Sequence, residues 1–249
     1  MDSLSALLRL SGPEKIEGGL VHTPKEIAQQ PDTWLETLSL LLQRASEIKS
    51  FLTESGIQRS PGERPVIYLI GAGTSDYIGH SLHLLLQQKW QCQIIPVAST
   101  TLLTNFEDYL LEGREALWIS FSRSGDSSEG VAVIERALQD CPDVRHLVIT
   151  CNSSARMLKV LEPVLHSFSI VLGDATNDRS LAMTSSFTNM VLFGQQLAHL
   201  WDEESFDKTL ESMIVAADYV LTEGADLAWN LAQQGYRRAC FVGAGSLGA

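Results

Sequence analysis

Apolar residues follow two alternating patterns along the chain. Unbroken apolar runs of about five or six residues have the length of buried parallel strands, whereas apolar residues at every third or fourth position predict amphipathic helices. Runs of the first kind occupy 66–70, 92–97, 116–121, 146–151 and 167–172. Helical patterns lie between them, so the sequence predicts an α/β fold with a doubly wound, five-stranded parallel sheet flanked by helices.

The same patterns divide the chain into four parts. They are an N-terminal helical arm (1–56), a domain that contains the five strands (57–202), a helical linker (203–237) and the start of a second domain (238–249). We expect residues 1–21 to dock loosely and Gly224 to break the helical linker. Cys240-Phe241-Val242 has the composition of a strand, and Gly243-Ala244-Gly245-Ser246 repeats the turn that follows the first strand of the sheet.

Polar capping patterns mark several helix starts. Thr23-Pro24-Lys25-Glu26 and residues 33–36 each place a threonine three positions before a glutamate, which predicts two helix N-termini in the arm. Thr184 or Ser185 is expected to cap an apolar helix that ends near Leu200.

Residues 122–127, which we call the serine loop, follow the third predicted strand and precede a helix that opens at Ser128. A helix start has unpaired N–H groups and partial positive charge, so it attracts anions. Gly125 lets the backbone turn where a Cβ atom would clash. Hydroxyl donors stand at the same place, on Ser122, Ser124 and Ser127. The pattern predicts a cradle for a phosphate monoester, although such residues are also typical of ordinary helix caps.

Residues 71–75, Gly-Ala-Gly-Thr-Ser, form a second polar turn after the first strand and are here called the glycine turn. A dinucleotide fingerprint would need Gly or Ala where Asp76 stands, and an acidic residue after the second strand, which ends in Val97-Ala98-Ser99. No Gly-Lys-Ser or Gly-Lys-Thr occurs, which argues against a nucleotide P-loop. Because ligands of parallel sheets bind at the carboxyl ends of strands, we expect both turns and Thr150-Cys151-Asn152 to converge at that edge.

The net charge and the cysteine content limit the classes of molecule that the protein is expected to bind. The 249 residues include 18 Lys and Arg and 30 Asp and Glu, which gives a formal net charge of −12. This charge argues against nucleic acid and anionic membranes, but a local group of N–H and O–H donors can still bind a small anion. No apolar run approaches the ~18 residues of a membrane span. The four cysteines form no Cys-x-x-Cys pair, so no metal or redox motif is present, and reduced thiols are typical of the cytoplasm.

Together these turns resemble the SIS, or sugar isomerase, domain family, which binds phosphosugars. The glycine turn is similar to the first turn of that family, and the serine loop is similar to its Ser-x-Ser-Gly-x-Thr/Ser phosphate motif. Further segments resemble the AgaS subfamily, whose members are galactosamine-6-phosphate deaminases or tagatose-6-phosphate ketose/aldose isomerases. These segments are Glu26-Ile27, Gln30-Pro31, Trp34, Thr100-Thr101, Thr104-Asn105, Asp108-Tyr109-Leu110, Asp178-Arg179 and Ala182-Met183-Thr184-Ser185-Ser186.

The resemblance implies roles for nine residues. It implies that the phosphate is held by the backbone of Arg123 and by Ser122, Ser124 and Ser127. It also implies that the sugar site is lined by Gly73, Thr74 and Ser75, with Thr184 and Ser185 close to the sugar. Helix capping remains an alternative for the last four hydroxyl residues. Two alternatives remain for the Arg123 side chain, which can pair either with the phosphate or with Asp126.

The resemblance implies two tandem SIS halves, and the second half begins near Arg238 in this sequence and stops at Ala249. In related aminosugar enzymes the catalytic Glu, Lys and His come from that half, so the catalytic residues stay unassigned here. We expect a chain that binds a hexose or hexosamine 6-phosphate without a metal or cofactor, and that forms homo-oligomers because its C-terminal strand leaves an apolar edge. A phosphosugar-sensing regulatory module and a single-SIS isomerase that borrows catalytic groups from neighbouring subunits are the alternatives.

Overall fold

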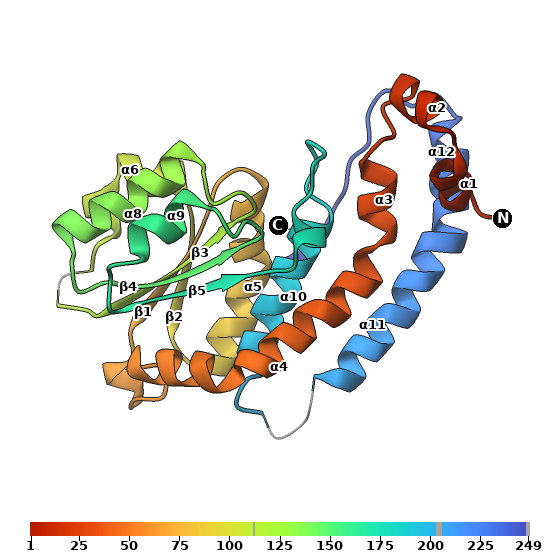
Figure 1. The fold of residues 1–249 in the computed structure, drawn as a ribbon. Coiled ribbons are helices and arrows are strands. Elements are labelled where there is room, and N and C mark those ends of the chain that lie inside the picture. The colour runs from red at the N-terminus through yellow and green to blue at the C-terminus, as the bar shows by residue number, and fades with distance from the viewer. Residues whose placement is uncertain (112, 203–205, 248–249) are drawn as a thin grey trace.

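A five-stranded parallel sheet is the centre of the molecule (Figure 1). The computed structural model describes residues 1–111, 113–202 and 206–247. The strands are β1 (Val66–Gly71), β2 (Gln93–Ala98), β3 (Ala116–Ser122), β4 (Arg145–Thr150) and β5 (Ser167–Val171), in the spatial order β2-β1-β3-β4-β5. Each pair of neighbours is parallel. This sheet confirms the predicted fold class, and every strand lies within a residue or two of its predicted position.

Helices cover both faces of the sheet, because alternate residues of each strand point to opposite sides. Ile67 and Leu69 belong to the core under one face, whereas Val66 and Tyr68 belong to the core under the other. The first face is covered by α4 (Gln30–Glu54), α5 (Thr74–Trp90) and α10 (Ser185–Ala198). The second face carries α6 (Ser99–Thr104), α7 (Phe106–Tyr109), α8 (Ser128–Asp140) and α9 (Arg156–Leu161).

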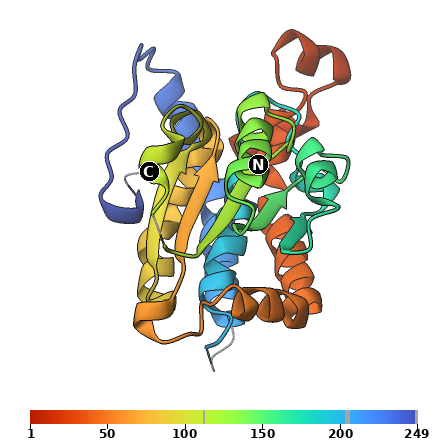
Figure 2. The same cartoon turned by 90° about the vertical axis from the view of Figure 1, so that its left-hand side faces the viewer.

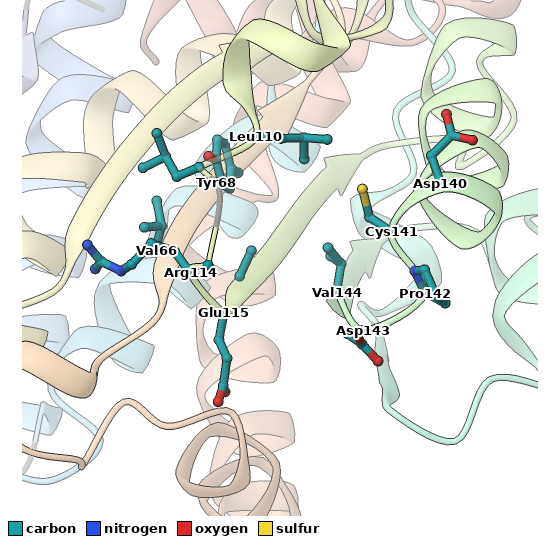
Figure 3. Close-up of a pocket in the computed structure, with 13 residues that line it drawn as sticks. Val66, Tyr68, Leu110, Arg114, Glu115, Asp140, Cys141, Pro142, Asp143 and Val144 are labelled. Carbon is teal, nitrogen blue, oxygen red and sulfur yellow. The ribbon is translucent and has the colours of Figure 1, made fainter.

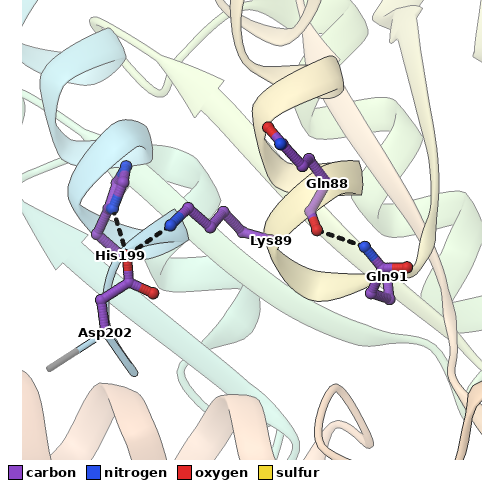
Figure 4. Close-up of polar contacts among 5 residues, drawn as sticks. All are labelled: Gln88, Lys89, Gln91, His199 and Asp202. Carbon is purple, nitrogen blue, oxygen red and sulfur yellow. Dashed lines mark hydrogen bonds and ion pairs between the residues drawn. The ribbon is translucent and has the colours of Figure 1, made fainter.

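The C-terminal ends of α5 and α10 are tied together by polar contacts (Figure 4). Asp202 accepts hydrogen bonds from Lys89 Nζ at 2.6 Å and from His199 Nδ1 at 2.7 Å. These hydrogen bonds lower the pKa of Asp202. Gln91 ends α5 in the left-handed conformation, with φ of 52°, and its side chain donates to the carbonyl of Gln88. The turn at Gln91 returns the chain to the sheet as β2.

Helices from the two ends of the chain lie side by side outside the sheet domain (Figure 1). The N-terminal ones are α1 (Ser3–Arg9), α2 (Gly12–Glu17) and α3 (Thr23–Ala28), and the C-terminal ones are α11 (Asp207–Tyr219) and α12 (Ala225–Ala232), joined by a π-helical turn (Val220–Gly224). Short 3-10 turns occupy Pro61–Glu63, Asp174–Thr176 and Gly245–Leu247. Ser3 donates through its backbone N–H and its hydroxyl to Asp226 on α12, both at 2.6 Å. Helix α1 therefore packs on α12, in contrast to the loosely docked segment expected for 1–21.

Two predictions about the C-terminal part are wrong. Gly224 has helical dihedral angles and continues the helix through the π turn instead of breaking it. Residues 240–242 form no strand, and Phe241 and Val242 are 95% and 92% exposed. A strand needs backbone partners, and no described strand pairs with this segment, which runs along the outside of α5 to the turn at Gly245–Leu247 (Figure 2). Parts of the predicted linker, 203–205, and of the second domain, 248–249, lie outside the described residues.

The helix start predicted at Thr23 is confirmed by α3, but the predicted capping box and the predicted second start at Thr33 are wrong. His22 is the N-cap of α3, without a side-chain bond, and Glu26 turns away from this helix start to bond a distant segment. Helix α4 already begins at Gln30, so Thr33 lies inside its first turn and donates to the carbonyl of Gln30 at 3.0 Å. None of the helices in the described ranges is long and apolar enough to cross a membrane.

Candidate functional site

The serine loop gathers three hydroxyls around Gly125. Ser122 Oγ accepts from the Gly125 N–H at 3.0 Å, Ser124 Oγ from the Asp126 N–H at 3.3 Å, and Ser127 Oγ from the Gly130 N–H at 3.3 Å. Within the described structure these hydroxyls accept hydrogen bonds and donate none, so their protons remain available to an anion. Ser127 is also the N-cap of α8, as the helix-cap reading expected.

Gly125 is required at the centre of this loop for two reasons. Its φ is +62°, a conformation that residues with a Cβ atom rarely adopt. A Cβ atom here would also lie 2.4 Å from the Cβ of Ala155. The loop is therefore packed closely against the segment that follows β4.

Residues at and just after the end of β4 form hydrogen bonds with the backbone of the serine loop. The Arg123 carbonyl accepts from the Cys151 N–H at 3.1 Å and from Thr150 Oγ1 at 3.2 Å, and Asn152 Nδ2 donates to the Ser124 carbonyl at 2.8 Å. Asp126 accepts from the N–H of Arg156, the first residue of α9, at 2.8 Å. The predicted meeting of residues 122–127 and 150–152 at the carboxyl edge is confirmed.

The glycine turn lies at the neighbouring strand end. Gly73 is the N-cap of α5 and has a φ of +56°, and Thr74 is exposed at the first helical position. Ser75 is buried, and its hydroxyl contacts the sulfur of Met183 at 3.7 Å. Neither Thr74 nor Ser75 supplies a side-chain cap for α5, so the capping alternative is not what the structure shows for them.

A cavity of about 10 Å³ lies beneath these two turns. Its polar lining comes from Ser99, Ser120, Ser122 and Ser127. A space of this size holds a single water at most. Ser122 is buried, whereas Ser124 and Ser127 are partly exposed and Ser128 at the start of α8 is exposed, so a larger anion could approach the loop only from its solvent side.

A third segment, residues 178–184, completes the site. Asp178 is 5% exposed, and its carboxylate accepts from the backbone N–H groups of Thr184 at 2.9 Å, Ser185 at 3.1 Å and Ser186 at 2.8 Å. The hydroxyls of Thr184 and Ser186 donate to it as well. Asp178 therefore caps α10, whereas the sequence predicted that Thr184 or Ser185 would cap this helix. An aspartate six residues before the expected helix start was the available signal.

Contacts from both turns reach this segment. Ser75 contacts Met183, as described above, and Arg123 Nη1 donates to the Ser180 carbonyl at 2.9 Å. The expected alternative of an Arg123–Asp126 ion pair is not formed. Ser185 is fully buried, and its hydroxyl donates to the Glu26 carbonyl at 2.6 Å. Residues 178–184 therefore form a wall beside the glycine turn and the serine loop.

Two ionisable groups close to the site have raised pKa values. Burial raises the pKa of the Cys151 thiol to about 12, so this cysteine is protonated at neutral pH and is no nucleophile. Burial also raises the pKa of Asp76, and His80, whose Nε2 lies 3.6 Å from the carboxylate, partly opposes this shift. In the described ranges no group of three or more His, Cys, Asp or Glu side chains is arranged to hold a metal ion.

A separate hollow of about 610 Å³ lies at the opposite edge of the sheet (Figure 3). Its labelled residues come from the first half of β1, from the segment between α7 and β3, and from the end of α8 and the residues after it; they include Tyr68, Arg114, Cys141 and Val144. Burial raises the pKa of the Cys141 thiol. This hollow contains none of the residues predicted to bind a phosphosugar.

The chain was compared with family models, with curated proteins and with solved structures. No protein-family model matches the chain. The D-galactosamine-6-phosphate deaminase AgaS of Shewanella sp. (strain ANA-3) is 35% identical over 246 residues, which cover 97% of this chain and 61% of the relative. The AgaS deaminase of Escherichia coli is 32% identical over 226 residues, 90% of this chain and 57% of the relative. The chain thus spans about 60% of the length of the curated relatives it matches.

Two solved structures share the fold closely. One is a Clostridium novyi NT protein provisionally named tagatose-6-phosphate ketose/aldose isomerase, with 31% identity and a TM-score of 0.83 over 90% of this chain and 56% of that one. The other is the tagatose-6-phosphate ketose/aldose isomerase of Escherichia coli, with 32% identity and a TM-score of 0.70 over 79% of this chain and 53% of that one.

Proposed function

Because this chain belongs to the SIS, or sugar isomerase, family, we propose that it is the phosphosugar-binding part of an amino-sugar-phosphate deaminase or aldose–ketose isomerase. The proposed substrate is galactosamine 6-phosphate and the proposed product tagatose 6-phosphate, as the names of the relatives suggest. One observation carries the proposal: three free hydroxyl donors surround Gly125 at the start of α8. Helix starts and hydroxyls of this kind bind phosphate esters.

The phosphate would lie at the mouth of the serine loop, where Ser122, Ser124 and Ser127 donate to its oxygens. Backbone N–H groups beside Arg123 and at the start of α8 would add partial positive charge, so the net charge of −12 is no obstacle. The sugar would extend toward Gly73 and Thr74 on one side and residues 178–184 on the other. The contacts of Ser75 and Arg123 with that segment support this placement.

The catalytic groups are proposed to come from a second SIS half. Aldose–ketose chemistry needs a base at C2 and an acid or base at the ring oxygen. The walls described above offer hydroxyls and backbone groups, and their charged side chains Asp178 and Arg123 are engaged in holding the fold. Asp76 and His80 are a further titratable pair beside the glycine turn. We therefore assign 57–202 as the binding domain, 1–56 and 203–237 as helical arm and linker, and 238–249 as the start of the second half.

Calorimetry with galactosamine 6-phosphate tests the binding proposal. Replacing Ser122 and Ser124 together with alanine should weaken binding by about 100-fold or more, because each hydroxyl makes a charge-assisted hydrogen bond. Ser128→Ala is the matched control, since that hydroxyl donates to Glu129 at 3.2 Å instead of facing the loop. Unchanged affinity in a folded double variant would overturn the proposal. Efficient ammonia release by this chain alone would overturn the assignment of catalysis to a second half.

Self-association is part of the proposal. Large apolar side chains are exposed on the C-terminal part of the chain, at Val215, Tyr219, Phe241, Val242 and Leu247. Apolar surface of this kind favours contacts between copies. Light scattering at micromolar concentration should therefore detect oligomers, and a monomer at all concentrations would contradict this expectation.

A further inference from the structure

Glu26 of α3 makes contacts that its own helix does not need. The residue is 7% exposed, and its carboxylate accepts from the Arg179 N–H at 2.6 Å and from the Ser180 N–H at 3.2 Å. The Ser180 hydroxyl also donates to it. A buried carboxylate needs such partners. Among the residues that the structure describes, all the hydrogen-bond donors to this carboxylate lie on one segment about 150 residues away in the sequence.

Ser180 is also the residue that holds the serine loop. Its carbonyl accepts the hydrogen bond from Arg123 Nη1 at 2.9 Å. The main chain of Arg123 lies between Ser122 and Ser124, two of the hydroxyl donors. Glu26, Ser180 and Arg123 therefore form one continuous chain of hydrogen bonds from the N-terminal arm to the phosphate cradle.

Further hydrogen bonds tie the end of α3 to residues on both sides of Ser180. Gln29 Nε2 donates to the Ala175 carbonyl at 2.6 Å and to Ser185 Oγ at 3.0 Å. Ser185 in turn donates to the Glu26 carbonyl. The end of α3 therefore contacts the chain both before and after Ser180, which supports the position of the Ser180 carbonyl.

We propose that Glu26 is a positioning residue of the phosphosugar site, which acts by holding Ser180 where its carbonyl orients the Arg123 guanidinium and, with it, the serine loop. The inference rests on the proposed function and extends it, because it makes the N-terminal arm part of the binding site. Glu26 itself touches no ligand. Its loss leaves the three serines in place but frees the side chain that fixes the loop against residues 178–184.

A double-mutant cycle on ligand affinity tests this coupling. Glu26→Gln keeps the side-chain shape but replaces one acceptor oxygen with an NH₂ group, and Arg123→Met keeps an unbranched chain without the guanidinium. Calorimetry with galactosamine 6-phosphate should show about tenfold weaker binding for Glu26→Gln. In the Arg123→Met background the same change should have no further effect, since the chain of bonds is already broken. Glu47→Gln, on the exposed face of α4, is the matched control and should bind like the unmodified chain.

The outcomes separate this inference from the proposed function. No binding by the unmodified chain overturns the proposed function, and the inference with it. Normal binding that Glu26→Gln leaves unchanged overturns the inference alone. Equal tenfold losses in both backgrounds would show that Glu26 acts by another route than Arg123. If Glu26→Gln fails to fold, Ser180→Ala replaces it in the cycle, because this change removes the hydroxyl bond but keeps the carbonyl, and a twofold to fivefold loss that disappears with Arg123→Met is then expected.

Discussion

Two walls of the candidate site are built in different ways. In the serine loop each hydroxyl bonds a backbone N–H two or three residues further along the chain. The wall formed by residues 178–184 depends on Glu26, which is about 150 residues away in the sequence, as well as on the nearby carboxylate of Asp178. The hydrogen bonds that the three hydroxyls make within the first wall are thus specified locally, whereas the contacts of Glu26 with the second wall form only after the N-terminal arm has packed against the sheet domain.

The difference suggests separate tasks for the two walls. The hydrogen bonds within the serine loop can form whenever the sheet below it is folded, and the Arg123–Ser180 bond then fixes the loop against the second wall. A locally built loop suits the recognition of the phosphate in the proposed substrate. A wall held by distant contacts can change with the arm or with bound partners. The predictions that follow concern first the sheet that supports both walls, then variants in each wall separately, and last a pair far from both.

The largest effect should come from the sheet itself, through His146 of β4. This residue is 1% exposed, and burial, assisted by the neighbouring His166, lowers its pKa from 6.5 to about 4. The unfolded chain therefore binds the proton more readily, so stability is complete above pH 6.5 and falls as the pH drops toward 4. We expect a loss of about 3 kcal/mol at pH 4, which would weaken both walls together.

Urea unfolding between pH 7 and 4 measures this effect. The variant His146→Leu should lose most of the decrease between pH 6.5 and about 5, where most carboxylates are still ionised. Exposed His22→Gln controls for the loss of a histidine. An unchanged pH profile in His146→Leu would assign the acid sensitivity to other groups.

Gly125→Ala should damage the serine loop alone. The positive φ and the 2.4 Å approach to Ala155 together predict a loss of about 2.5 kcal/mol in unfolding free energy, with loss of galactosamine 6-phosphate binding. Gly235→Ala provides the comparison, because Gly235 has a φ of +69° but no atom within 4 Å of the added Cβ. Equal losses in the two variants would show that the contact with Ala155 is unimportant.

Asp178→Ala should damage the second wall. It leaves three backbone N–H groups at the start of α10 without their acceptor, and we expect a loss of about 2 kcal/mol in unfolding free energy. Thr184→Ala removes only one donor hydroxyl to the same carboxylate and should cost about 0.5 kcal/mol. Chemical denaturation distinguishes the two, and similar losses would contradict the capping role of Asp178.

The smallest effect is expected far from both walls, at the pair between Lys89 and Asp202. Both side chains are about one-third exposed, so Lys89→Met should lower the unfolding free energy by about 0.5 kcal/mol at low salt. The difference should shrink in 0.5 M salt because exposed pairs are screened. A loss above 2 kcal/mol that salt does not reduce would show that the pair contributes more than a surface contact.

Much of the site could be predicted because it is local. The five strands and the serine loop follow from apolar runs and from polar residues within about six positions of each other. The role of Glu26 was hidden by a Thr-x-x-Glu pattern that usually marks a helix start, and nothing in a local pattern points to Ser180. The strand predicted at 240–242 failed for a related reason, since composition alone does not provide a neighbouring strand.

The sequence alone determined the alternation of strands and helices, the glycine at the centre of the serine loop and the hydroxyls around it, because these depend on side-chain periodicity and on steric limits within a few residues. The tertiary structure alone decided which carboxylates serve the site. Glu26 and Asp178 are buried next to unpaired N–H groups only once α3, β5 and α10 have come together, and a hydrogen bond is formed by distance in space, whatever the separation along the chain.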